Sequence, residues 1–224
     1  MKKLLAKLTL FAALCGLAAC GSATANLQVF NASPDAPALD ILTDGTVVVA
    51  GLPDLAFEQY QEVDSGTLTI RANEAGTSRT LAELNATLGA NQDYTLIVLN
   101  FVSDLETLLL QDDNSIDQAS TAKLRLVNAS PSAPSLDFYF TAPGTDISNV
   151  SPLVSDLSFK EASQYLVVGS STYQVRVTQS GTKTVLVDSG NFVLSPSQVR
   201  TGVVVDAAGG GGPFNIVFLP DKLQ

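Results

Sequence analysis

Short stretches of alternating apolar and polar residues, separated by turn residues, run through most of the chain. In residues 66–73, Leu68 and Ile70 alternate with threonine and arginine, and residues 169–179 show the same period of two. Such alternation is typical of strands with one buried and one exposed face. Residues 94–101 are apolar at nearly every position, which predicts a central strand covered on both faces. Because no long segment has helical periodicity, the pattern predicts an all-β protein.

One stretch of this pattern occurs twice. Residues 27–40 read LQVFNASPDAPALD, and residues 124–137 read LRLVNASPSAPSLD. Nine of the 14 aligned positions are identical, at a constant offset of 97 residues, which indicates a tandem duplication. We therefore expect two tandem immunoglobulin-like β-sandwich domains, over residues 27–111 and 122–221, each with its own core.

Within the repeated stretch, a strand is interrupted by Asn-Ala-Ser-Pro and then resumes. Proline cannot donate to a strand ladder and biases the preceding residue toward extended geometry, so a stiff corner between two sheets is predicted. We expect the asparagine to cap backbone groups there and the aspartate to lie within reach of the same corner. A ligand site at the corner is the alternative, but ordinary turn chemistry favours the structural interpretation. The residues assigned to this motif are Asn31, Pro34, Pro37 and Asp40 in the first copy and Asn128, Pro131, Pro134 and Asp137 in the second.

Both copies resemble the signature of the family called domain of unknown function 4397, whose repeats begin with a strand that runs into N-A-S-P-x-A-P-x-h-D. The resemblance covers most of residues 26–221. It implies a secreted or lipid-anchored bacterial protein built from β-sandwich repeats, without an assigned activity. It supplies no catalytic residues.

Residues 1–19 have the pattern of a lipoprotein signal peptide. Three lysines precede an apolar core at residues 8–17, which is too short to span a bilayer, and a Leu-Ala-Ala-Cys sequence ends at Cys20. This resembles the bacterial lipobox, in which the cysteine is lipidated before cleavage. We therefore expect a cell-envelope protein anchored at Cys20 by acyl chains such as palmitate, with residues 20–26 as a tether. Gly21, rather than aspartate, predicts the outer membrane in a host with two membranes. The alternative is an ordinary signal peptide and an incidental cysteine.

The charge and the missing residue types exclude several functions. The chain after residue 19 retains nine basic and 22 acidic residues, for a net charge of −13, so we expect no nucleic-acid partner. The chain has no histidine, which excludes a Ser-His-Asp triad and most zinc sites. Because Cys20 is expected to be lipid-blocked, we expect no disulfide. No cofactor and no enzymatic activity are predicted.

Residues 112–121 are polar and acidic, and they predict a solvated linker between the repeats. No metal site is assigned, although Asp112, Asp113 and Asp117 are candidates because carboxylate oxygens suit Ca²⁺. Their spacing departs from that of a calcium loop. The glycine run at residues 209–212 is expected to form a flexible hairpin tip, since no helix follows it.

The function that the sequence favours is a lipid-anchored envelope module for binding, adhesion or scaffolding, with an unidentified protein or glycan partner. A Ca²⁺-stiffened structural spacer is one alternative. Another is an envelope hydrolase that uses carboxylates or a Ser-Lys pair, since Ser180 and Lys183 match the S-x-x-K string. That string lies in a predicted hairpin turn without its partner motifs, so we interpret it as accidental.

Overall fold

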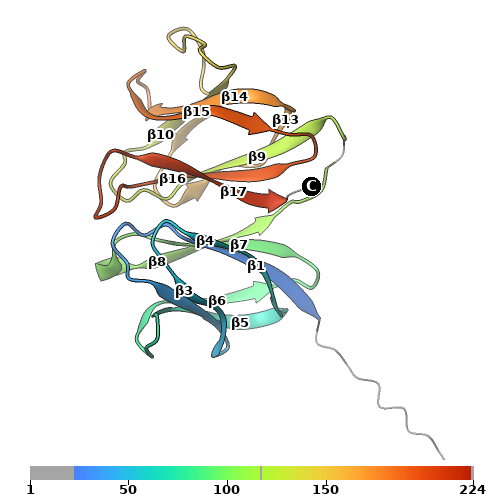
Figure 1. Ribbon diagram of the computed structural model, residues 1–224, viewed down its shortest axis with the longest axis vertical. Helices are drawn as coiled ribbons and strands as arrows, with labels where there is room; N and C mark the ends of the chain where they lie inside the picture. The colour runs from blue at the N-terminus through green and yellow to red at the C-terminus, as the bar shows by residue number, and fades with distance from the viewer. Residues whose placement is uncertain (1–22, 117, 223–224) are drawn as a thin grey trace, which may run out of the picture.

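The computed structural model describes residues 23–116 and 118–222, which form two β-sandwiches stacked into four layers (Figure 1). The first repeat contains β1 (Thr24–Asn31), β2 (Leu39–Thr43), β3 (Thr46–Leu52), β4 (Phe57–Asp64), β5 (Gly66–Glu74), β6 (Thr80–Leu88), β7 (Asp93–Leu99), the 3-10 turn η1 (Val102–Asp104) and β8 (Glu106–Asp112). The second contains β9 (Thr121–Asn128), β10 (Leu136–Thr141), β11 (Val154–Leu157), β12 (Glu161–Ala162), β13 (Leu166–Gly169), β14 (Ser171–Gln179), β15 (Val185–Leu194), β16 (Val199–Val205) and β17 (Asn215–Lys222). The predicted all-β sandwich architecture is confirmed.

Each repeat is built from two facing sheets. The first repeat has the strand orders β4-β1-β7-β8 and β3-β2-β5-β6, and the second has β11-β10-β14-β15 and β12-β9-β16-β17, with β13 also paired to β9. One pair in each repeat is parallel, β1 with β7 and β9 with β16. The repeated corner carries the chain from β1 to β2, and from β9 to β10, so it links the two sheets of each sandwich.

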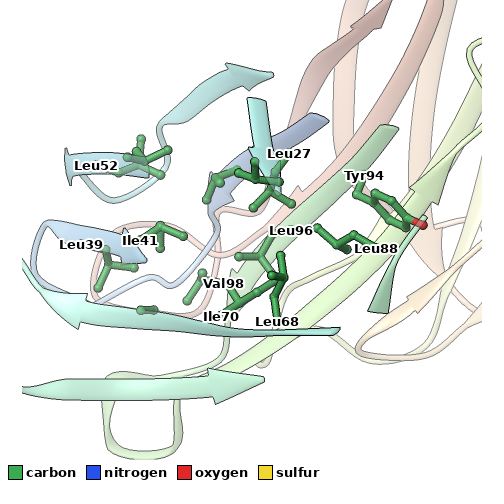
Figure 2. Packing of buried hydrophobic residues seen from close by; sticks show 14 of the residues in the cluster. Leu27, Leu39, Ile41, Leu52, Leu68, Ile70, Leu88, Tyr94, Leu96 and Val98 are labelled. Atoms are coloured by element: carbon green, nitrogen blue, oxygen red, sulfur yellow. The ribbon is translucent and has the colours of Figure 1, made fainter. Parts of the chain in front are cut away.

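The period-two alternation of the sequence sorts side chains between two different cores. In β1, Leu27 and Val29 point into the first sandwich, where they pack with residues such as Leu96 of β7 (Figure 2). Phe30, which follows Val29, points the other way and is fully buried against the second repeat, as is Ile97. The strand predicted to be covered on both faces is β7, and the second repeat provides its outer cover.

Each repeat has a core of its own, as expected, but the two repeats also share an apolar contact that the sequence did not predict. A third buried cluster joins sheet β4-β1-β7-β8 to sheet β12-β9-β16-β17. It includes Phe30, Ile97 and Leu99 from the first repeat and Val127 and Val203 from the second, all fully buried. Sequence alternation could not reveal this cluster, because an apolar residue on an outer face does not show which surface covers it.

Both repeats point in the same direction. One end of the molecule, which we call the tether end, holds the start of β1, the end of β8, residues 113–116 and 118–120, and the start of β9 (Figure 1). Both corners lie at the opposite end, which we call the corner end. Two contacts between the repeats show this arrangement: Gly209 N donates to Pro34 O at 2.7 Å, and Lys160 pairs with Glu106 beside η1. Within residues 23–116 and 118–222, no helix is long and apolar enough to cross a bilayer.

Candidate functional site

The two asparagines of the repeated corners are fully buried and make equivalent contacts. Asn31 donates through Nδ2 to Leu52 O at 3.5 Å and accepts through Oδ1 from Ser33 N at 3.3 Å. Asn128 donates to Leu157 O at 3.1 Å and accepts from the amide of the serine two residues after it, Ser130, at 3.2 Å. Each amide thus satisfies backbone groups where the strand stops, which is what a structural cap requires.

The two aspartates of the motif bind backbone amides away from the corner asparagines. Asp40 does not contact Asn31; it accepts from Gly51 N at 2.7 Å and from Gly76 N at 2.8 Å. Asp137 likewise accepts from the amides of Asp156 and Gly181, both at 2.9 Å. All four donors have positive φ. Each carboxylate therefore ties a hairpin turn to the neighbouring edge strand of the outer sheet, β3 in the first repeat and β11 in the second, and it does not cap the corner as expected.

The four prolines of the motif differ in how far they are buried. Pro34 is buried under the second repeat, and its carbonyl accepts from Gly209. Pro37 and Pro131 are half-buried, whereas Pro134 is exposed, with its carbonyl 3.4 Å from Asn128 Nδ2.

The glycine run at residues 209–212 contacts both corners. The expectation of a flexible hairpin tip is therefore wrong. Besides the bond from Gly209 to Pro34, Gly211 N donates to Ser132 Oγ in the second corner at 3.2 Å and to Asp206 Oδ2 at 2.8 Å. Gly210 packs so closely on Phe101 that an added Cβ would lie 2.7 Å from the ring. The corners, this loop and η1 form one continuous surface at the corner end.

A second cluster, which sequence reasoning missed, lies buried between the repeats. In the first repeat, Asp112 Oδ2 accepts from Tyr60 OH at 2.6 Å and from Thr95 Oγ1 at 2.8 Å. In the second, Asp221 Oδ2 accepts from a tyrosine and a threonine in the same way, Tyr165 OH at 2.9 Å and Thr201 Oγ1 at 2.5 Å. Burial raises the pKa of both tyrosine hydroxyls, so they act as neutral donors.

A signal for this cluster was present in the sequence. The tyrosine, the threonine and the aspartate recur 105, 106 and 109 residues later in the chain. These offsets differ from the 97 residues that separate the corners, because the loops of the two repeats differ in length. The three positions are also far apart within each repeat, so local sequence comparison does not bring them together.

One guanidinium lies between the two aspartates. Arg125 Nη2 is 2.6 Å from Asp112 Oδ1 but 3.9 Å from Asp221 Oδ2, and all three side chains are almost completely buried. The equivalent position in the first repeat is Gln28, which carries no charge. Burial is the main reason that the pKa of Asp221 is raised to about 6; the charge of Arg125 opposes this shift, and the charge of Asp112 adds to it. Near Asp113 and Tyr165, the cluster borders a polar surface hollow of about 320 Å³.

The other candidate residues are not brought into a site. Asp113 pairs with Lys123, whose hydrogen bond lowers the pKa of the carboxyl to about 2. The solvated linker is thus shorter than predicted, because Asp112 belongs to β8 and is buried. Asp117 and Cys20 lie outside the described residues. Among the residues that the structure describes, no group of three or more acidic, cysteine or histidine side chains could hold a metal ion.

The S-x-x-K string is part of the turn between β14 and β15. The Nζ of Lys183 donates to Tyr139 OH at 3.1 Å and to Val150 O at 2.5 Å. The lysine therefore holds the loop between β10 and β11 over the outer sheet. Ser180 contributes a backbone bond to Ser135 O at 2.8 Å.

No curated protein matches the chain. Among solved structures, it is similar to a family 26 carbohydrate-binding module of Eubacterium rectale Amy13K in complex with maltoheptaose, with 9% identity, a TM-score of 0.28, and coverage of 90% of this chain and 98% of that chain. A streptococcal virulence factor described for α-glucan binding gives 8% identity, a TM-score of 0.29, and coverage of 81% and 93%. Scores this low do not establish a shared fold, so these two proteins carry no conclusion about what this chain binds.

The model of the family described as Domain of unknown function (DUF4397) matches residues 25–139, which is just over half of the chain. The match spans the whole first repeat and continues through the corner of the second. The chain therefore belongs to the DUF4397 family.

Proposed function

We propose that this protein is a lipid-anchored binding module of the bacterial cell envelope, and that its partner docks on the corner end. The observation that carries this proposal is the position of the duplicated motif. Both corners and the glycine loop lie at one end of the molecule, while the chain enters from the expected anchor at the other (Figure 1). An anchor at Cys20 would leave the corner end directed away from the membrane.

The corner end is suited to binding because it is exposed and yet firmly held. Asp35, Ser132, Pro134 and Ala208 are exposed on it. The backbone beneath them is fixed by the buried asparagines and by the bonds of the glycine loop to both repeats. A preorganised surface loses little conformational entropy when a partner binds, and loops on a rigid scaffold are common binding sites.

The chemistry of the surface narrows the class of partner. The full chain has 22 acidic and only 12 basic residues, which disfavours nucleic acid, and we therefore expect a protein or a glycan of the envelope as the partner. The buried asparagines are supports for the surface rather than contacts, because neither is reachable by a partner. We therefore place the contacts on the exposed residues between and beside the corners.

Crosslinking in intact cells, followed by identification of the attached neighbours, tests the proposal. We expect Ala208→Arg, at the corner end, to reduce attachment at least about tenfold, as loss of a binding hot spot does. The matched control is Ala90→Arg, an exposed alanine at the tether end, which should leave attachment unchanged. Neither change should alter the free energy of unfolding by more than about 0.5 kcal/mol, since both residues are exposed.

The same experiment tests the anchor with Cys20→Ala. We expect this variant to lose lipid labelling and to leave the membrane fraction. Parent-like membrane partitioning of the variant would contradict the anchor. Equal attachment by the Ala208→Arg variant and the parent would place the partner elsewhere on the molecule.

A further inference from the structure

The contact between the two repeats is made by equivalent positions on both sides. The strand registers match three positions of the first repeat with three of the second. The matched pairs are Phe30 with Val127, Ile97 with Val203, and Leu110 with Leu219, and all six residues belong to the shared cluster. The first repeat thus presents to the second the same face that the second presents to it. An interface of this kind is isologous, as in a two-fold symmetric homodimer.

The polar contacts across the junction obey the same symmetry. Gln28 Nε2 donates to Pro220 O at 3.2 Å, and Arg125 Nη1 donates to Gln111 O at 3.1 Å. Gln28 and Arg125 are equivalent at the offset of 97 residues, and Pro220 and Gln111 each precede the aspartate of a Tyr-Thr-Asp cluster. The contacts are therefore reciprocal. Gln28 of the first repeat contacts the end of the last strand of the second repeat, and Arg125 of the second repeat contacts the end of the last strand of the first.

We infer that this face of the repeat is a homotypic docking surface, and that a second copy of the chain can occupy it in place of the repeat from the same chain. The first repeat of one molecule would pair with the second repeat of the other, so that the covalent connection from β8 to β9 crosses between the two pairs. Two chains exchanged in this way fill all four faces, so the assembly closes as a dimer. This inference is independent of the partner proposed for the corner end.

Charge selects a first repeat with a second repeat as the exchanged pair. That pairing keeps Arg125 beside both Asp112 and Asp221, as in the single chain. Two first repeats would bring two copies of Asp112 together with no guanidinium, because Gln28 is neutral. The exchange also keeps the starts of all repeats at the tether end, so both chains of a dimer can be anchored in one membrane.

The first test asks whether the docking surface holds without the covalent connection. A protease site replaces residues 116–119 of the full chain, and the protein is cut after it has folded. We expect the two fragments to elute together in gel filtration at micromolar concentration. As a control, Ile97→Asp, which places a carboxylate in the shared cluster, should release the fragments after cutting. Separate elution of the fragments without this substitution would overturn the inference.

The second test asks for the second copy directly. Isotope-labelled and unlabelled cut proteins are mixed, and native mass spectrometry is expected to show complexes with one labelled and one unlabelled fragment. In the uncut chain, deletion of residues 116–119 should favour the exchanged dimer, measured by light scattering, because the shortened connection disfavours pairing within one chain. Absence of mixed complexes, or a deletion variant that is monomeric or unfolded, would count against a second copy as the occupant.

Discussion

Asp221 is a carboxylate that is held away from water. Its side chain is fully buried, and Oδ1 has no hydrogen-bond partner. The guanidinium that could compensate its charge is closer to Asp112, at 2.6 Å against 3.9 Å. Two buried carboxylates thus share one cation, and the charged form of Asp221 is the less well compensated of the two, which lowers the free energy of unfolding when Asp221 is ionised.

This cost predicts how stability depends on pH. The pKa of Asp221 is about 6 in the folded protein against an ordinary value of 3.8, so the folded state binds more protons between these values. The free energy of unfolding should fall as pH rises from about 4 to 6, by up to about 3 kcal/mol. We expect Asp221→Asn to remove this slope in urea unfolding followed across pH. The control Asp54→Asn, an exposed residue with the same change in charge, should retain it. Parallel slopes for all three proteins would contradict the assignment.

At the scale of elements, the glycine loop shows how a flexible sequence becomes a fixed connection. Gly209, Gly210 and Gly211 all have positive φ, between 76° and 99°, which other residues adopt only with strain. This backbone turns the loop so that its amides reach both corners. The loop is thereby part of the contact between the repeats.

Two alanine substitutions separate backbone strain from packing in this loop. Gly211→Ala should destabilise the protein by about 1–2 kcal/mol through its positive φ alone, because nothing lies within 4 Å of the added Cβ. Gly210→Ala carries the same strain and in addition displaces the ring of Phe101, for a further cost of about 1–3 kcal/mol. Chemical denaturation measures both. Equal losses would show that the loop does not pack on the first repeat in solution.

At the scale of the whole molecule, the shared cluster predicts that the repeats unfold together. We expect calorimetry to show one transition, with the calorimetric and van't Hoff enthalpies equal. Leu99→Ala in the shared cluster should lower the temperature of that single transition, at a cost of about 2–5 kcal/mol. Val193→Ala, at a side chain that is 61% exposed, should have little effect. Two transitions, of which Leu99→Ala moves only one, would mean that the repeats unfold independently.

The sequence alone was sufficient for the features that depend on local order. Alternation and turn residues determined the strands, the recurrence of Asn-Ala-Ser-Pro identified the duplication and the family, and proline chemistry placed a crossover between sheets. Each of these features follows from residues that are neighbours along the chain, because period, turn type and proline geometry act over a few positions.

Only the tertiary structure decided how the two repeats meet. The alternation of β1 shows that Phe30 and Leu27 lie on opposite faces, but not that the second repeat covers Phe30. In the same way, Asp112 was interpreted as solvated because its neighbours in sequence are polar, whereas Arg125 and Tyr60 bury it. The burial of a residue depends on chain segments far away in sequence, and here on a reciprocal fit between two copies of the same face.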